Sequence, residues 1–290
     1  MASTEKRRRE LARAKYLRQQ QRRDMARQRM RRRNQIVAGV AAVVVIAAGG
    51  TWAGIAASGG GKSTTAAAAS ASPSAAASAS ASASPAAKAG SAHVAGCTTP
   101  APGSPNKKQW KKAPATTIDT AATYTATINT NCGALTVKLD AAKAPVTVNN
   151  FAFLAGQKYF DHVKCHRLTV TGLYMMQCGD PTGTGTGGPG YTFKDENLSS
   201  LGKKNSQGLV TYPAGTVAMA NSGPNTNGSQ FFIVYLDSPL PPNYTPFGTV
   251  TSGLDSLKKV AAAGTDNHNG QGDGAPLQTY VMNSVTVAKS

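Results

Sequence analysis

Hydrophobic and polar positions follow a strand-like pattern through much of the second half of the chain. The stretches 124–129, 135–139, 216–220 and 231–235 alternate or run apolar between turn-forming residues, which is typical of β-strands. They are not interleaved with helical segments of similar length, so a parallel α/β sheet is not expected. The pattern predicts a mainly β domain, folded as a barrel or a sandwich.

Two other segments carry the period of an amphipathic helix. The first is expected to begin near Pro145, because proline is favoured at the first helical position, and to bury Val148, Phe151, Ala152 and Leu154. The second is expected to run from Ser252, its N-cap, to Gly264, with an apolar face of Leu254, Leu257, Val260 and Ala261. We therefore expect two helices to cover the β domain.

Composition divides the chain into four parts. Residues 1–35 are strongly basic, since 14 of the 31 lysines and arginines lie within the first 33 positions. Residues 36–57 carry no charge, and about 20 apolar residues suffice to span a bilayer. Residues 58–114 are rich in Ala, Ser and Pro, which predicts a disordered linker. The remainder, 115–290, is long enough for one globular domain.

This division predicts a protein of the cell membrane with a single transmembrane helix at 36–57. The positive-inside rule places the basic N-terminus in the cytoplasm and the globular domain outside. A cleaved signal peptide is the alternative, but its basic and apolar regions are usually shorter, and no clean cleavage site ends this span. The basic segment could also bind nucleic acid. Anionic lipid headgroups beside a span explain it more simply, so no nucleic-acid partner is expected.

Four cysteines, Cys97, Cys132, Cys165 and Cys178, lie beyond the apolar segment. An even number in an exported domain suggests disulfides, with three possible connectivities. Cys165 and Cys178 flank a predicted hairpin, but the two-residue period of a strand counts against their pairing, so the connectivity stays open. An alternative is a metal site formed by Cys165 and Cys178 together with His162 and His166. Its spacing matches no common zinc pattern, and no metal is expected.

Candidate chemistry centres on one arginine and one loop. Arg167 is the only arginine after residue 33, and the following segment 174–177 supplies an aromatic ring, thioethers and an amide. If these strands pair, the guanidinium shares a face with groups that can hold an apolar ring and its flanking carbonyls. A surface salt bridge is the alternative role for Arg167. Residues 219–232 place Asn and Gly between apolar runs, which predicts an ordered loop beside an aromatic wall.

Five short motifs occur in a characteristic order in this region. They are CHR at 165–167, YMMQCGD at 174–180, GTGG at 185–188, DEN at 195–197 and MANSGPNTNGSQFF at 219–232. In order and rough spacing they resemble the cyclophilins, which are peptidyl-prolyl cis/trans isomerases. The resemblance covers about 124–287 and implies an eight-stranded antiparallel barrel capped by two helices. With its basic and Ala/Ser-rich segments, the chain looks like a membrane-anchored actinobacterial form.

The resemblance also implies roles for individual residues. Arg167 matches the family's catalytic arginine, Gln177 its carbonyl-binding glutamine, and His166 a histidine that supports the site without acting as a base. The implied proline pocket is lined by Tyr174, Met175 and Phe232, with Leu240 and Tyr244 near its rim. The implied path of the substrate backbone follows Ala220, Asn221 and Gln230.

The implied activity is isomerisation of X-Pro bonds in extracytoplasmic polypeptides, by a non-covalent mechanism that uses no cofactor. Segment 237–247 lacks the tryptophan that many relatives use to bind cyclosporin, so weak cyclosporin binding is expected. The alternatives are a chaperone that binds proline-containing segments without turnover, or an envelope adaptor of the same fold. The presence of Arg167, Gln177 and Phe232 together favours the enzyme.

Overall fold

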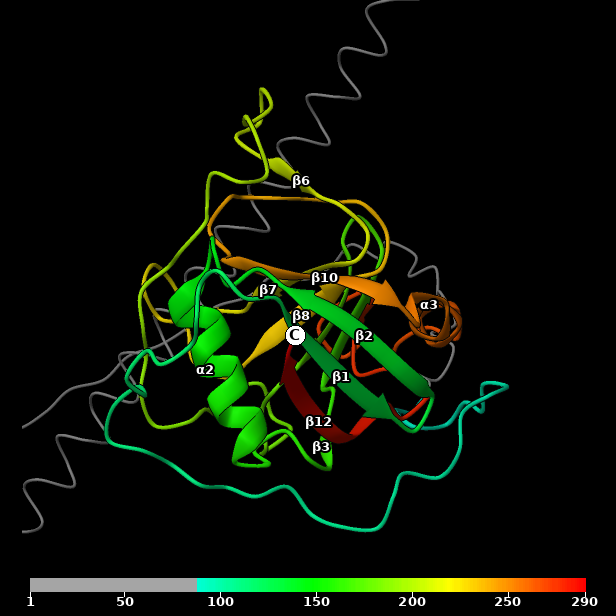
Figure 1. Ribbon diagram of the computed structural model, residues 1–290. Helices are drawn as coiled ribbons and strands as arrows, with labels where there is room; N and C mark the ends of the chain where they lie inside the picture. Colours follow the sequence, from blue (N-terminus) through cyan, green and yellow to red (C-terminus); the bar gives the residue numbers. More distant parts are fainter. Residues whose placement is uncertain (1–87) are drawn as a thin grey trace, which may run out of the picture. The chain divides into compact units, whose positions relative to one another are not determined.

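Within residues 88–290, which the computed structural model describes, there are twelve strands and two helices (Figure 1). The strands are β1 (Tyr124–Thr130), β2 (Gly133–Leu139), β3 (Val163–Lys164), β4 (Arg167–Val170), β5 (Tyr174–Cys178), β6 (Val210–Tyr212), β7 (Thr216–Met219), β8 (Phe231–Val234), β9 (Ser238–Leu240), β10 (Pro246–Ser252), β11 (Asp273–Gly274) and β12 (Val281–Lys289). The helices are α2 (Pro145–Gly156) and α3 (Leu254–Ala262).

Ten strands form one antiparallel sheet in the order β11-β4-β5-β8-β7-β10-β2-β1-β12-β3, and β6 pairs with β9. β3 and β4 stand near opposite ends of this order, yet only Cys165 and His166 separate them in the chain. So short a connection spans at most about 11 Å, so the sheet must curl until its two edges approach each other. The expected mainly β, barrel-like architecture with two helices is confirmed.

The number of strands differs from the expected eight. The four strands predicted from alternation appear as β1, β2, β7 and β8, within one or two residues of their predicted bounds. The additional strands include β3 and β11, of two residues each, and the separate pair β6 and β9, of three residues each. Segments this short cannot display a two-residue period, so periodicity alone does not reveal them.

Both helices form, with differences at their edges. α2 begins at Pro145 and buries Val148, Phe151 and Leu154 as predicted, but Ala152 is only half-buried. The expected N-cap of the second helix is wrong, because Ser252 ends β10 and the cap is Gly253. Gly253 is left-handed, with φ of 89°, and a side chain there would overlap the carbonyl oxygen of Ala134. Only glycine fits that junction.

Residues 88–114, here called the strap, correct the last part of the expected disordered linker at 58–114; its first part, 58–87, lies outside the described residues. The strap contains no helix or strand, but it follows the lower edge of the domain in Figure 1 as far as α2. A disulfide joins Cys97 to Cys132, and Trp110 packs against Phe153 and Tyr159 with ring centroids 5.2 and 5.7 Å apart. The average composition of the segment did not indicate either the disulfide or the packing of Trp110.

The expected transmembrane helix and basic segment lie outside the described residues. Between residues 88 and 290, neither helix has the length and apolar character needed to cross a bilayer.

Candidate active site

The smaller of two apolar clusters lies where the proline pocket was expected. Its buried members are Met175, Val210, Tyr212, Ala218, Phe232 and Val234, and its half-buried members are Leu173, Leu201, Ala220, Leu240 and Tyr244. The ring of Phe232 lies 5.5 Å from that of Tyr244 and 6.2 Å from that of Tyr212, between centroids. Four of the expected pocket and rim residues are therefore brought together: Met175, Phe232, Leu240 and Tyr244. Ala220, which was expected along the substrate backbone, joins the same cluster.

Strand alternation explains which residues join this cluster and which do not. In the pairing of β5 with β8, Met175 lies opposite Val234 and Gln177 opposite Phe232, so these side chains share one face. Tyr174 is one position out of phase. It packs against the larger cluster, with its ring 6.0 Å from that of Tyr235. The structure does not bring Tyr174 into the cluster around Phe232.

Arg167 lies opposite Gln177 in the β4–β5 hairpin, as the hypothesis of a paired hairpin required. Its Nε and Nη2 atoms donate hydrogen bonds to Oδ1 and Oδ2 of Asp273, both at 2.8 Å. Asp273 belongs to β11, which pairs with β4 and so carries the carboxylate to the guanidinium. These hydrogen bonds raise the pKa of Arg167 above its ordinary value, against the opposing effect of burial.

The salt bridge leaves part of the guanidinium available. An arginine has five N–H donors, and the two bonds to Asp273 use two of them. Nη1 lies 3.5 Å from Oε1 of Gln177, and the side chain of Gln177 shares a face of the sheet with Phe232. The salt-bridge alternative and the catalytic hypothesis are therefore compatible, because the pair orients the guanidinium without occupying all its donors.

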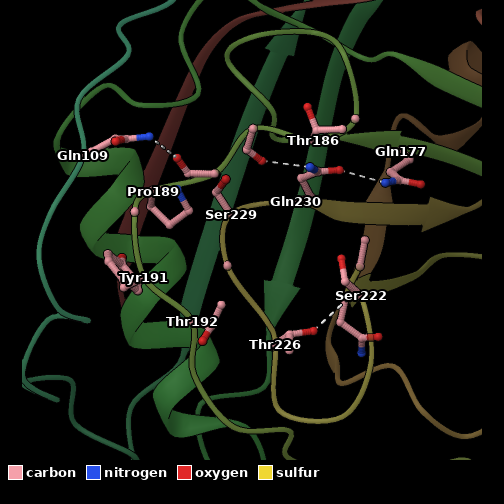
Figure 2. A pocket seen from close by; sticks show the side chains of 17 residues that line it. Gln109, Gln177, Thr186, Pro189, Tyr191, Thr192, Ser222, Thr226, Ser229 and Gln230 are labelled. Atoms are coloured by element: carbon pink, nitrogen blue, oxygen red, sulfur yellow. Dashed lines mark hydrogen bonds between the residues drawn. The ribbon is translucent and has the colours of Figure 1, made fainter. Parts of the chain in front are cut away.

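A polar chain continues from Gln177 across the site. Its Nε2 donates to Oε1 of Gln230 at 2.9 Å, and Nε2 of Gln230 donates to the carbonyl oxygen of Gly187 at 2.9 Å (Figure 2). The side chain of Asn221 donates to the carbonyl oxygen of Asn243 at 2.7 Å. Gln177, Gln230 and Asn221 are thus held in fixed orientations beside the apolar cluster.

His166 has no hydrogen-bond partner at either ring nitrogen among the described residues. Burial lowers its pKa, and the nearby charges of Arg167 and Lys164 lower it further, against the opposing charge of Asp180. A neutral imidazole without a polar partner cannot relay a proton. The arrangement agrees with the expected supporting role.

A cavity of about 660 Å³ adjoins the cluster and shares Ala220 with it. Its lining is uncharged: Gln109, Gln177, Gly185, Thr186, Gly187, Gly188, Pro189, Gly190, Tyr191, Thr192, Ala220, Asn221, Ser222, Thr226, Gly228, Ser229 and Gln230. Asp180, buried beneath the glycine-rich wall, accepts hydrogen bonds from the backbone N–H groups of Thr182, Thr184, Gly185 and Gly187. Burial alone would raise the pKa of Asp180, but hydrogen bonds from the Thr182 hydroxyl and from the backbone N–H groups of Gly187, Thr182 and Gly185 lower it overall.

Comparison with known proteins decides the family. Residues 125–287 match the sequence profile described as cyclophilin type peptidyl-prolyl cis-trans isomerase/CLD. The chain belongs to the cyclophilin family. The strap of this cyclophilin precedes the matched region.

Two mycobacterial relatives are each named probable peptidyl-prolyl cis-trans isomerase B. The protein from Mycobacterium leprae is 50% identical over 169 residues, which cover 57% of each chain. The protein from Mycobacterium tuberculosis is 49% identical over 161 residues, which cover 54% of this chain and 52% of the relative. This cyclophilin thus matches little more than half the length of either relative. A crystal structure of a cyclophilin type isomerase from Cryptosporidium parvum aligns with 58% of this chain and 99% of its own, at 29% identity and a TM-score of 0.49.

The structure also resolves the cysteine connectivity. In this cyclophilin Cys165 pairs with Cys178, and Cys97 with Cys132. The alternation argument against the first pair does not apply, because Cys165 precedes β4, which begins at Arg167. The metal-site alternative is wrong, since both of its cysteines are consumed in the disulfide.

Sequence reasoning missed two residues of this site. Asp273, the partner of Arg167, lies 106 positions away in a glycine-rich stretch. The only indication in the sequence was the salt-bridge alternative for Arg167, which did not identify the partner carboxylate. Gln109 lay in the segment expected to be disordered, and nothing in its surroundings indicated a role in the cavity.

Proposed function

We propose that this cyclophilin catalyses cis/trans isomerisation of X-Pro bonds in proline-containing polypeptides. The observation that carries the proposal is the orientation of Arg167. Its guanidinium donates two 2.8 Å hydrogen bonds to Asp273, which fix it beside Gln177, and Gln177 lies opposite Phe232 in the pairing of β5 with β8. A cation and an apolar cluster thus lie side by side, and family membership supports the same activity.

The reaction needs neither a nucleophile nor a metal. Rotation about an X-Pro bond must break amide resonance, at a cost of about 18–20 kcal/mol, so the uncatalysed step takes on the order of tens to hundreds of seconds. In the twisted state the prolyl nitrogen becomes pyramidal and exposes a lone pair. A hydrogen bond from Arg167 to that nitrogen is stronger in the twisted state than in the planar ground state, and this difference lowers the barrier.

The remaining residues hold the substrate while the bond turns. Phe232, Met175 and their cluster receive the proline ring, and Gln177 binds the carbonyl oxygen. Ala220, Asn221 and Gln230 line the adjoining cavity, along which the substrate backbone passes. Because the donors are fixed before the substrate arrives, little reorganisation opposes the twisted state.

Location outside the cytoplasm is part of the proposal. It rests on the uncharged segment 36–57 with basic residues on one side only, and a single-pass anchor follows from this pattern. Two disulfides and no free cysteine among residues 88–290 fit an oxidising compartment. Protease treatment of intact cells should remove the globular domain, and its protection would contradict this placement.

An isomerase assay on the full chain tests the activity. We expect a proline-containing peptide to isomerise much faster than its uncatalysed rate, and Phe232→Ala to raise KM by losing contact with the proline ring. Binding of the peptide without acceleration would overturn the enzyme and favour the proline-binding chaperone. Absence of both would favour the envelope adaptor.

Weak cyclosporin binding also belongs to the proposal. In segment 237–247 the residues that reach the apolar cluster are Leu240 and Tyr244, and no tryptophan is present. Inhibition of the same assay measures the affinity. A submicromolar inhibition constant would contradict the expectation.

A further inference from the structure

The strap contributes one residue to the lining of the cavity that adjoins the apolar cluster. Gln109 lines the cavity, and Figure 2 shows it on the opposite side from Gln177. The backbone N–H of Trp110 donates to the carbonyl oxygen of Pro189 at 2.8 Å. A side chain at Gly190 would come within 2.8 Å of the Trp110 carbonyl oxygen, so the glycine permits this close approach. One residue of the cavity lining, Gln109, therefore lies outside the family match.

The strap is fixed on both sides of Gln109. Before it, Nδ2 of Asn106 donates to the carbonyl oxygens of Gln157 and Lys158, both at 2.9 Å, just beyond the end of α2. After it, Trp110 packs on Phe153 and Tyr159. The segment between these anchors has a defined position relative to the cavity.

Four lysines flank Gln109: Lys107, Lys108, Lys111 and Lys112. All four are exposed, and none forms an ion pair within the part of the chain that the structure describes. Their Cα atoms lie within about 7–11 Å of that of Gln109, because a residue extends the chain by about 3.6 Å at most. These charges are thus carried by residues within three positions of a cavity-lining residue, a backbone separation comparable with the Debye length of about 8 Å at physiological ionic strength.

We propose that residues 107–112 make this cavity a binding site for acidic side chains beside the substrate proline. The inference rests on the proposed isomerase function and defines its substrate class: proline segments that contain Asp or Glu. The residues that line the cavity carry no charge, and Asp180 beneath the glycine-rich wall is already bonded to the N–H groups of Gly185 and Gly187, so the strap lysines supply the positive charge that favours acidic side chains. The curled sheet supplies the catalytic residues, and the strap selects among the substrates.

Two sets of three proline peptides, which differ only in one residue flanking the proline, test this inference. The flanking residues are Glu, Gln or Lys, placed before or after the proline in separate sets, and kcat/KM is measured with the full chain. We expect the Glu peptide of at least one set to exceed the Lys peptide by about three- to tenfold at about 10 mM salt. The ratio should approach one at about 1 M salt, where the Debye length is about 3 Å.

Charge removal then locates the effect. The variant K107Q/K108Q/K111Q/K112Q should lose most of the preference while keeping its rate on the Gln peptide. A matched variant, K138Q/K143Q/K258Q/K259Q, removes equal charge from residues outside the cavity lining and should keep the preference. Equal rates on all three peptides at low salt, or equal loss in both variants, would overturn the inference and leave the isomerase intact. Failure to accelerate any peptide would instead overturn the proposed function, and the inference with it.

Discussion

At the scale of single residues, two carboxylates hold the polar parts of the site. Asp273 holds the guanidinium of Arg167 in one orientation. Asp180 accepts hydrogen bonds from backbone N–H groups of the glycine-rich loop. The sequence revealed Arg167 because it is the only arginine beyond residue 33 and because it resembles the family motif. It did not reveal Asp273, since a side-chain pair across 106 positions leaves no local pattern.

The variant Asp273→Asn tests the positioning of the arginine. An amide accepts only one of the two hydrogen bonds, so the guanidinium loses its fixed orientation. We expect kcat to fall about ten- to a hundredfold, with KM within about twofold, because a small misplacement of a catalytic group is costly. Asp140→Asn, which removes a half-exposed partner of Lys143, is the control and should leave both constants unchanged. A kcat of Asp273→Asn equal to that of wild type would contradict the account.

The lowered pKa of His166 predicts how the free energy of unfolding depends on pH. Its pKa is lowered by burial, so between this value and its ordinary value of 6.5 the unfolded chain binds a proton that the folded chain does not. Its contribution to the free energy of unfolding is therefore complete above about pH 6.5 and decreases as the pH falls below it. Urea unfolding across this range should show a smaller decrease for His166→Gln than for wild type. Identical pH dependence of the two proteins would refute this.

At the scale of elements, both helices and the strands β1, β2, β7 and β8 were predicted, because each shows a period or an apolar run between turn residues. β10 and β12 were not among the predicted strands, although they contain seven and nine residues. β3 and β11 were not predicted either, since each exists only through its partners in the sheet. The start of α2 shows the same limit. Ala144 provides no side-chain cap, and Glu196 caps the helix from about fifty positions away. Its carboxylate accepts from the N–H groups of Val146 at 3.1 Å and Thr147 at 2.8 Å.

Replacing Glu196 by Gln should therefore weaken α2. The change removes a negative charge from the positive end of the helix dipole and one of two acceptors, so we expect a loss of about 1–2 kcal/mol in the free energy of unfolding. Asp255→Asn, in the first turn of α3 and fully exposed to solvent screening, should cost about 0.5 kcal/mol or less. Urea denaturation measures both. Equal losses would show that Glu196 has no special role at this helix.

At the scale of the whole molecule, the strap lies between the cyclophilin domain and the segments that precede it in the sequence. Its sequence resembles a linker on average, and only Cys97 and Trp110 distinguish it, so composition gave a misleading expectation for 88–114. Packing against α2 and the disulfide to Cys132 together order it. Averages over a window cannot reveal order that depends on two anchoring side chains.

The double variant C97S/C132S measures how much this disulfide contributes. The bond closes a loop with a sequence separation of 35, for which the chain-entropy model gives about 4 kcal/mol; values of about 2–4 kcal/mol are typical. Denaturant unfolding should show a loss in this range. Because the pocket cluster does not include the strap, turnover of an uncharged peptide should change little. Loss of turnover in a folded variant would contradict this separation of roles.

The central claim is that Arg167 converts a proline-binding pocket into a catalyst. The most direct measurement compares wild type with Arg167→Ala in the full chain, recording turnover and peptide binding in parallel. We predict a fall in turnover of about a hundredfold or more, the magnitude expected when one transition-state hydrogen-bond donor is removed, with binding within a few fold. Near-normal turnover in the alanine variant would contradict the account.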